Sequence, residues 1–255
     1  MKDVRKGTLG LMLVFALMGG LSCGSGGGGD NSNPSPTVVG SGNIVQETRS
    51  VTGATDVELH GVANLTIEQG APEELILQTD DNLIALILTE VQGGILVIRS
   101  DPGFTLQPSQ RMEAVLRLIS IDSITLSGVG NITVPDLLTT IQLDLTLSGV
   151  GAIEIFDLDA QTSDVLISGI GDIVVDGQVD DQLITLTRRS LGDYDAEDLI
   201  SEIVDVKIAG SGSATVRVST ALNANITGSG SVFYHGSPVV TRTGSGTGNV
   251  IQLPP

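Results

Sequence analysis

Hydrophobic and polar residues alternate along most of this chain, and short glycine turns interrupt the alternation at regular steps. The clearest turns read Ser-Gly-Val-Gly at 127–130 and 148–151, and Ser-Gly-Ile-Gly at 168–171. Weaker copies begin at Arg189, Ala209, Thr227 and Thr243, so the turns recur at a nearly regular step. Alternation with a period of two indicates β-strands, and a steady step of about 20 residues is typical of repeat architectures. We therefore predict an all-β fold of stacked coils, each of about 20 residues.

Aliphatic residues recur at fixed places relative to each turn. If the residue before the first glycine is position zero, then positions −3, −1, +2, +5 and +7 are mostly Val, Ile or Leu. We predict that all five positions point into the core, because the glycines would interrupt the alternation and return position +2 to the inside. Coils stacked about 4.8 Å apart would bury continuous aliphatic columns and form a parallel β-solenoid, with right-handed crossovers. The column at position +2 would contain Val62, Val129, Val150, Ile170 and Leu191.

The regular step breaks at about residues 66–121, where we predict a β-meander insertion. Apolar runs at 75–79, 83–89, 95–99 and 113–118 are separated by turn signals. The period of 83–90 also fits a short helix, but its flanking turns favour a strand, and 104–110 reads as a polar loop. The meander would cover one end of the solenoid or lie along its side. The regular coils of 122–252 complete a single domain at 39–255, whose last, polar coils would cap the other end.

The amino terminus reads as an export signal over residues 1–22. Three basic residues precede an apolar run at 9–17 that is too short to span a bilayer. The run leads to Gly20-Leu21-Ser22-Cys23, which resembles a bacterial lipobox except that Gly20 stands where Leu is usual. By that resemblance Cys23 would be lipidated, residues 23–38 would be a Gly/Ser/Pro-rich tether, and Gly24 would direct the lipoprotein to the outer membrane. The alternative is an ordinary secretory peptide with an incidental cysteine.

Composition excludes several classes of function. The net charge of −18 repels nucleic acid and anionic membrane surfaces. The single cysteine permits no intrachain disulfide, and two distant histidines do not provide the usual spacing of a zinc site. We therefore expect no metal, no cofactor and no nucleic-acid partner.

The opening GSGNIV…TGATDVELHGVANLTIEQG at 40–70 and the stretch ISIDSITLSGVGNI at 119–132 are similar to one bacterial family. It is the putative auto-transporter adhesin, head GIN domain family, and the resemblance extends from residue 39 to about 252. The resemblance implies an exported β-helical protein. It supplies no catalytic residues, and "adhesin" is a label rather than a demonstrated activity.

Two outward rows of polar residues are candidate binding positions. Position −4 has an acidic row, and position +4 has a row of variable residues in which two acidic side chains occur. Such carboxylates could bind Ca²⁺, which takes six to eight oxygen ligands. Vertical stacking does not converge ligands on one point, however, so a solvated row that discourages edge pairing is the favoured interpretation. The candidates are Asp144, Asp164 and Asp205 at −4, together with Asp56, and Asn131, Asp172 and Asp193 at +4.

A charged patch disturbs the repeat at 188–198. Arg188 and Arg189 precede Asp193 and Asp195 there. Exported β-helix proteins include glycan-active enzymes that use Arg or paired carboxylates in a groove, so a glycan site is one hypothesis. The other is that the arginines pair with carboxylates on adjacent coils. Because no complete catalytic constellation accompanies the patch, we do not predict an enzyme.

The aromatic cluster at 233–235 has two interpretations, a ligand platform or a plug for the end of the solenoid, and we favour the plug. The sequence as a whole predicts a non-enzymatic exported lipoprotein. It would bind a protein or glycan outside the cytoplasm, at the bacterial cell envelope, and would contact the bilayer through its lipid anchor. The alternative function is glycan binding or glycan chemistry at 188–198.

Overall fold

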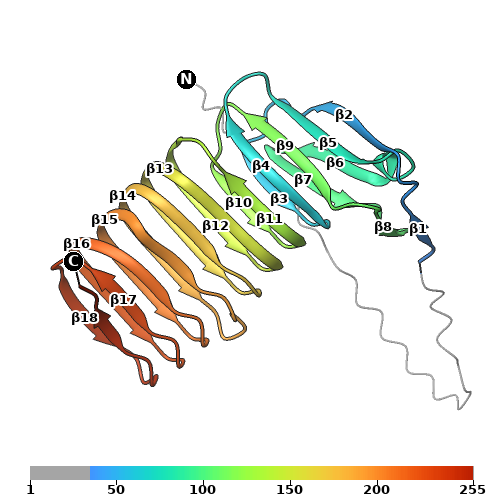
Figure 1. Ribbon diagram of the computed structural model, residues 1–255. Coiled ribbons are helices and arrows are strands. Elements are labelled where there is room, and N and C mark those ends of the chain that lie inside the picture. Colours follow the sequence, from blue (N-terminus) through green and yellow to red (C-terminus); the bar gives the residue numbers. More distant parts are fainter. Residues whose placement is uncertain (1–34, 255) are drawn as a thin grey trace, which may run out of the picture. The chain divides into compact units, whose positions relative to one another are not determined.

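A computed structural model describes residues 35–254, and the predicted all-β solenoid is confirmed (Figure 1). Seventeen strands form one continuous sheet. Within this part of the chain, no helix is both long enough and apolar enough to span a bilayer. The strands of the regular coils are β10 (Ser123–Leu126), β11 (Val129–Val134), β12 (Leu138–Leu147), β13 (Val150–Ile167), β14 (Ile173–Leu186), β15 (Tyr194–Ile208), β16 (Ala214–Ile226), β17 (Val232–His235), β18 (Val239–Thr243) and β19 (Val250–Gln252).

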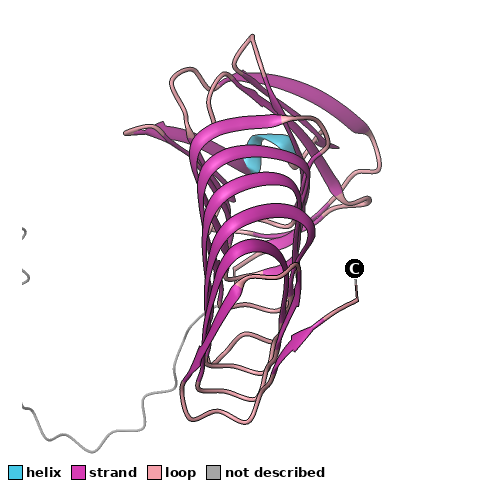
Figure 2. Cartoon of the chain, turned by 90° about the vertical axis from the view of Figure 1, so that its left-hand side faces the viewer, coloured by secondary structure: helices cyan, strands magenta, loops and turns pink. Residues whose placement is uncertain are grey.

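Parallel pairing stacks each regular coil on the one before it. Strands β12 to β16 run side by side in chain order, and Figure 2 shows the strands of the stack as successive bent ribbons. Equivalent positions lie in register, so each aliphatic column is continuous through the stack. Side chains of one such column are almost wholly buried. It contains Val57, Ile124, Leu145, Val165, Ile184, Val206 and Ala224.

The region at 66–121 is a mixed sheet rather than a purely antiparallel meander. β7 and β9 pair in parallel with β3 and β4, so they extend the solenoid by one coil outside the chain order. β2, β5 and β6 then add antiparallel pairings. The bounds are β2 (Ile44–Ser50), β3 (Asp56–Leu59), β4 (Ala63–Gln69), β5 (Glu74–Asp80), β6 (Ile87–Gln92), β7 (Ile95–Ser100) and β9 (Met112–Leu118).

Two local predictions in this region were wrong. The expected strand at 83–89 begins instead as a 3₁₀-helix, η1 (Ile84–Leu86), and the strand follows as β6. The expected loop at 104–110 contains β8 (Thr105–Gln107), which pairs with β1 (Thr37–Val39). Pairing between segments so distant in the chain has no local sequence signal, so only the tertiary fold could reveal β8.

The prediction that position +2 points inward was also wrong. The side chains of that column are 44–66% exposed. The alternation runs unbroken through the turn, and the two glycines take the inward places. A side chain has no room at these places because the backbone of the neighbouring coil lies too close: a Cβ on Gly130 would lie 1.7 Å from the carbonyl oxygen of Ala63. Gly130 also has a φ of 149°, which favours glycine.

Candidate functional site

The acidic row at position −4 is discontinuous. Asp144 and Asp164 are register neighbours on β12 and β13. Leu183 of β14 then pairs with Asp164 on one side and Asp205 on the other, so it separates the two carboxylates. At the other end Asp56 pairs with Ser123. Partial burial, followed by repulsion from Asp122 and Asp144, raises the pKa of Asp56 above its ordinary value.

The outward residues at position +4 bind the backbone of the next coil. Asn131 Oδ1 accepts a hydrogen bond from the Ala152 N–H at 3.2 Å. Asp172 accepts one from the Asp193 N–H at 2.8 Å, and Asp193 in turn accepts one from the Ser213 N–H at 2.6 Å. These side chains are exposed, as expected, but one oxygen of each already serves coil stacking.

No metal centre is evident in the described part of the chain. Between residues 35 and 254, no group of three or more His, Cys, Asp or Glu side chains is arranged to hold a metal ion. The −4 and +4 rows lie on opposite sides of the glycine turn in each coil. The arrangement of the two rows among the described residues therefore gives calcium binding no geometric support.

The structure divides the predicted charged patch. Arg188 lines a surface hollow of about 370 Å³ together with Lys207 and Asn225 of the next two coils. Asp193 and Asp195 do not line this hollow. Within residues 35–254 neither Arg188 nor Arg189 forms an ion pair. Lys207 was not a sequence candidate, although it follows Arg188 by close to one coil step.

The aromatic cluster lies on β17. Tyr234 packs against the core, and His235 is buried with its Nε2 3.2 Å from Glu197 Oε1. β19 pairs with β17 on the outer side, so the cluster does not end the solenoid. This packing resembles the predicted plug only in that Tyr234 contributes to the core.

An exposed aliphatic column lies at the glycine corner, and sequence reasoning had placed it in the core. From Val129 onward, the N–H groups of its members bond the carbonyl oxygens of the preceding coils at 2.9–3.2 Å, which holds the side chains in one line. We call this row the corner column. It consists of Val62, Val129, Val150, Ile170 and Leu191.

Comparisons with known proteins agree with this architecture. The family model for "Putative auto-transporter adhesin, head GIN domain" matches residues 54–238. A crystal structure of a putative adhesin from Bacteroides fragilis NCTC 9343 superposes with a TM-score of 0.81 at 24% identity, and the match covers 85% of this chain and 100% of that one. A putative adhesin from Parabacteroides merdae ATCC 43184 gives a TM-score of 0.70 at 20% identity, with 86% and 100% covered.

A third structure, described as a putative lipid binding protein from Parabacteroides distasonis ATCC 8503, gives a TM-score of 0.68 at 22% identity, with 86% and 100% covered. At these identities the likenesses show the fold alone. No curated protein matches the chain. Cys23, the predicted lipidation site, lies outside the described residues.

Proposed function

Because the chain belongs to the family described as putative auto-transporter adhesin, head GIN domain, we propose that it is a non-enzymatic binding module of the adhesin type. The description of the family names an auto-transporter adhesin, which is a type of protein that acts at the cell surface, and it names no catalytic activity. We propose a protein or glycan ligand outside the cytoplasm. The description of one structural relative as lipid-binding adds a lipid to the candidate ligands.

The corner column is the observation that carries this proposal. Five stacked aliphatic side chains stay 44–66% exposed on a rigid scaffold. Contiguous exposed apolar surface of this kind marks interaction sites more often than isolated exposed residues do. The equivalent positions of later coils are polar. They are Ser211 and Ser229 by the repeat, and Thr247 by its backbone, because the Thr247 N–H bonds the Gly228 carbonyl as the Ser229 N–H bonds that of Gly210. The fold itself therefore does not require an aliphatic side chain there.

A triple substitution tests the role of the corner column. Val129→Ser, Val150→Ser and Ile170→Ser copy the later coils, so folding should be retained while binding is lost. Bacteria that display the full chain would be assayed for attachment to arrays of extracellular proteins and glycans. The matched control is Phe156→Ser, at an exposed apolar residue of β13 outside the column. Attachment that survives the triple substitution unchanged would refute this surface.

A second candidate function is the binding of an anionic glycan in the hollow of Arg188 and Lys207. Two cations with no ion-pair partner among residues 35–254 line the same hollow on a protein of net charge −18. Arg188→Ala and Lys207→Ala should each weaken the binding of a uronate-containing or sulfated oligosaccharide. Arg189→Ala is the matched control, because Arg189 is exposed but does not line the hollow. Equal loss in all three variants would indicate non-specific charge attraction instead.

The membrane attachment is also a proposal. We propose that the signal peptide is cleaved before Cys23 and that a lipid on this cysteine anchors the protein to the outer membrane. The supporting observation is the match of 20–23 to a lipobox, followed by a Gly/Ser-rich tether. Mass spectrometry of the mature amino-terminal peptide should show an acylated cysteine, and Cys23→Ser should release the protein from the membrane fraction. A mature protein without acyl mass would contradict the anchor.

A further inference from the structure

A pocket of about 290 Å³ lies in the mixed-sheet region, away from the hollow of Arg188. Its walls are mainly aliphatic or aromatic, and three hydroxyl residues join them, Thr79, Ser100 and Thr105. No charged side chain lines it. The main apolar contributors are Leu83, Ile87, Phe104, Leu106, Pro108 and Met112.

One wall is the segment that carries β8, and Asp80 fastens it. The Asp80 carboxylate is buried and accepts hydrogen bonds from the Ser109 N–H at 2.9 Å and the Ser109 hydroxyl at 2.6 Å. It also accepts one from the Gly42 N–H at 2.7 Å. These bonds lower the pKa of Asp80. One carboxylate therefore joins the end of this wall to the turn after β1.

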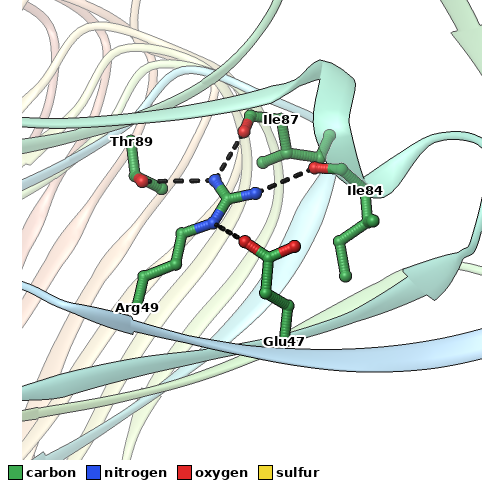
Figure 3. Close-up of polar contacts among 5 residues, drawn as sticks. All are labelled: Glu47, Arg49, Ile84, Ile87 and Thr89. Carbon is green, nitrogen blue, oxygen red and sulfur yellow. Dashed lines mark hydrogen bonds and ion pairs between the residues drawn. The ribbon is translucent and has the colours of Figure 1, made fainter.

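A second wall is formed by Leu83, just before η1, and by Ile87 at the start of β6, and Arg49 fixes this segment (Figure 3). The Arg49 guanidinium donates to the carbonyl oxygens of Ile84 at 2.9 Å and Ile87 at 2.5 Å. It also donates to the Thr89 hydroxyl at 3.2 Å and to Glu47 at 2.7 Å. The backbone that presents Leu83 and Ile87 to the pocket is thus held from the neighbouring strand β2.

Size and chemistry together restrict the occupant. An apolar cavity of about 150 Å³ holds a benzene-sized molecule, so this pocket takes one larger apolar group. Its volume is at the lower end of the range for ligand pockets, and its apolar lining with a few hydroxyls is typical of them. The charges that fasten these two walls, on Asp80 and Arg49, are already used in bonds within the protein.

We propose that the pocket binds the end of a single hydrocarbon chain, such as the acyl chain of a lipid or free fatty acid, with its head group outside. Val62 lines the pocket and is also the first residue of the corner column, so the pocket adjoins exposed apolar surface. This inference deepens the proposed function, on which it rests for the non-enzymatic binding role.

Calorimetric titration with decanol and with decanoate tests the pocket, using the full chain with Cys23→Ser so that no lipid anchor contributes. We expect both probes to bind with one site and similar affinity, because no lining residue is charged. Thr105→Trp fills the pocket from β8 and should weaken the binding of both decanol and decanoate at least tenfold. Thr220→Trp, on the exposed face of β16, is the matched control and should bind as the parent does.

A second pair of variants covers the case in which Thr105→Trp fails to fold. Phe104→Asp places a charge in the pocket wall and should weaken binding at least tenfold, whereas Phe156→Asp on β13 should not. Absence of decanol binding by the parent, or binding that survives both pocket substitutions, would overturn the proposal. Retained decanol binding in the corner-column triple variant would show that the pocket acts independently of that surface.

Sedimentation with phosphatidylcholine vesicles distinguishes the sources of the chain. Vesicle binding that Thr105→Trp abolishes supports a chain drawn from a bilayer. Decanol binding without vesicle binding supports a soluble fatty acid or a similar free molecule. Failure of the surface-attachment assay would leave both results standing, so the proposed function and this inference fail separately.

Discussion

The Tyr194 hydroxyl donates a hydrogen bond to Gln182 Oε1 at 2.7 Å inside the solenoid. Both residues are buried, and Gln182 Nε2 donates in turn to the Ser201 hydroxyl. Tyr194 occupies the column position that Ile173 and Ala214 occupy in the neighbouring coils. In this one coil, therefore, a hydrogen-bonded polar side chain replaces an apolar one. A buried polar group is stable only when its hydrogen bonds are made.

Removal of the Tyr194 hydroxyl should destabilise the protein. Tyr194→Phe leaves the Gln182 carbonyl without its donor, and we expect a loss of about 1–3 kcal/mol in the free energy of unfolding. The double variant Tyr194→Phe with Gln182→Leu removes both partners and should lose less than the single one. Urea denaturation measures both. A single variant as stable as the parent would show that the bond contributes nothing.

The same residue predicts a loss of stability in alkali. Burial, and then the charge of Asp195, raise the pKa of Tyr194 above its ordinary value of 10.0. Because the pKa is higher in the folded state, the hydroxyl ionises more readily in the unfolded chain. The contribution of Tyr194 to stability is therefore complete below about pH 10 and decreases as the pH rises beyond it. The midpoint of thermal unfolding should therefore fall above about pH 10 in the parent. In Tyr194→Phe the fall should be smaller, and an equal fall in both would argue against the assignment.

Two glycines at the same repeat position should differ in their tolerance of alanine. A Cβ on Gly128 would lie 2.0 Å from the carbonyl oxygen of Gly61, whereas a Cβ on Gly61 would have its nearest neighbour at 3.7 Å. We expect Gly128→Ala to cost about 3 kcal/mol or more, because overpacking of this kind forces the backbone to move. Gly61→Ala should cost under about 1 kcal/mol. Chemical denaturation measures the stability of the two variants. Equal losses in the free energy of unfolding would refute the close approach of the neighbouring backbone at Gly128.

Two isoleucines in adjoining coils should separate inward from outward positions. Ile153 is fully buried, and Ile170 of the corner column is 50% exposed. Ile153→Ala should cost about 2–5 kcal/mol through lost burial and a cavity, and Ile170→Ala about 0.5 kcal/mol or less. The midpoints of urea unfolding will show the difference. Comparable losses of stability in the two variants would instead support the inward position of Ile170 that the sequence had suggested.

Asp80 predicts acid sensitivity of the wall that carries β8. Its lowered pKa means that its contribution is present above its ordinary value of 3.8 and is lost as the pH falls below it. Asp80→Asn should speed amide hydrogen exchange at Ser109 and Gly42 near about pH 7, and the difference from the parent should shrink below about pH 4. Glu90→Gln, at an exposed residue of β6, is the control. Unchanged exchange at Ser109 would contradict the fastening role.

The sequence predicted the coils well because each coil repeats the same inward aliphatic places, and parallel stacking only adds copies in register. It predicted position +2 wrongly because a composition of Val, Ile and Leu does not say on which side of a strand a residue lies. It failed to anticipate β8, the pocket and the proximity of Arg188 to Lys207, since all three depend on segments from different coils or strands.

The glycine turns, the aliphatic columns and the step of about 20 residues determined a β-solenoid by themselves, because alternation and repetition are properties of the chain. Only the tertiary structure decided that the glycines face inward and that the corner column stays outside. The physical reason is the space at the corner, where the neighbouring coil's backbone leaves no room for a Cβ on Gly130. The valine between two such glycines must therefore point to solvent.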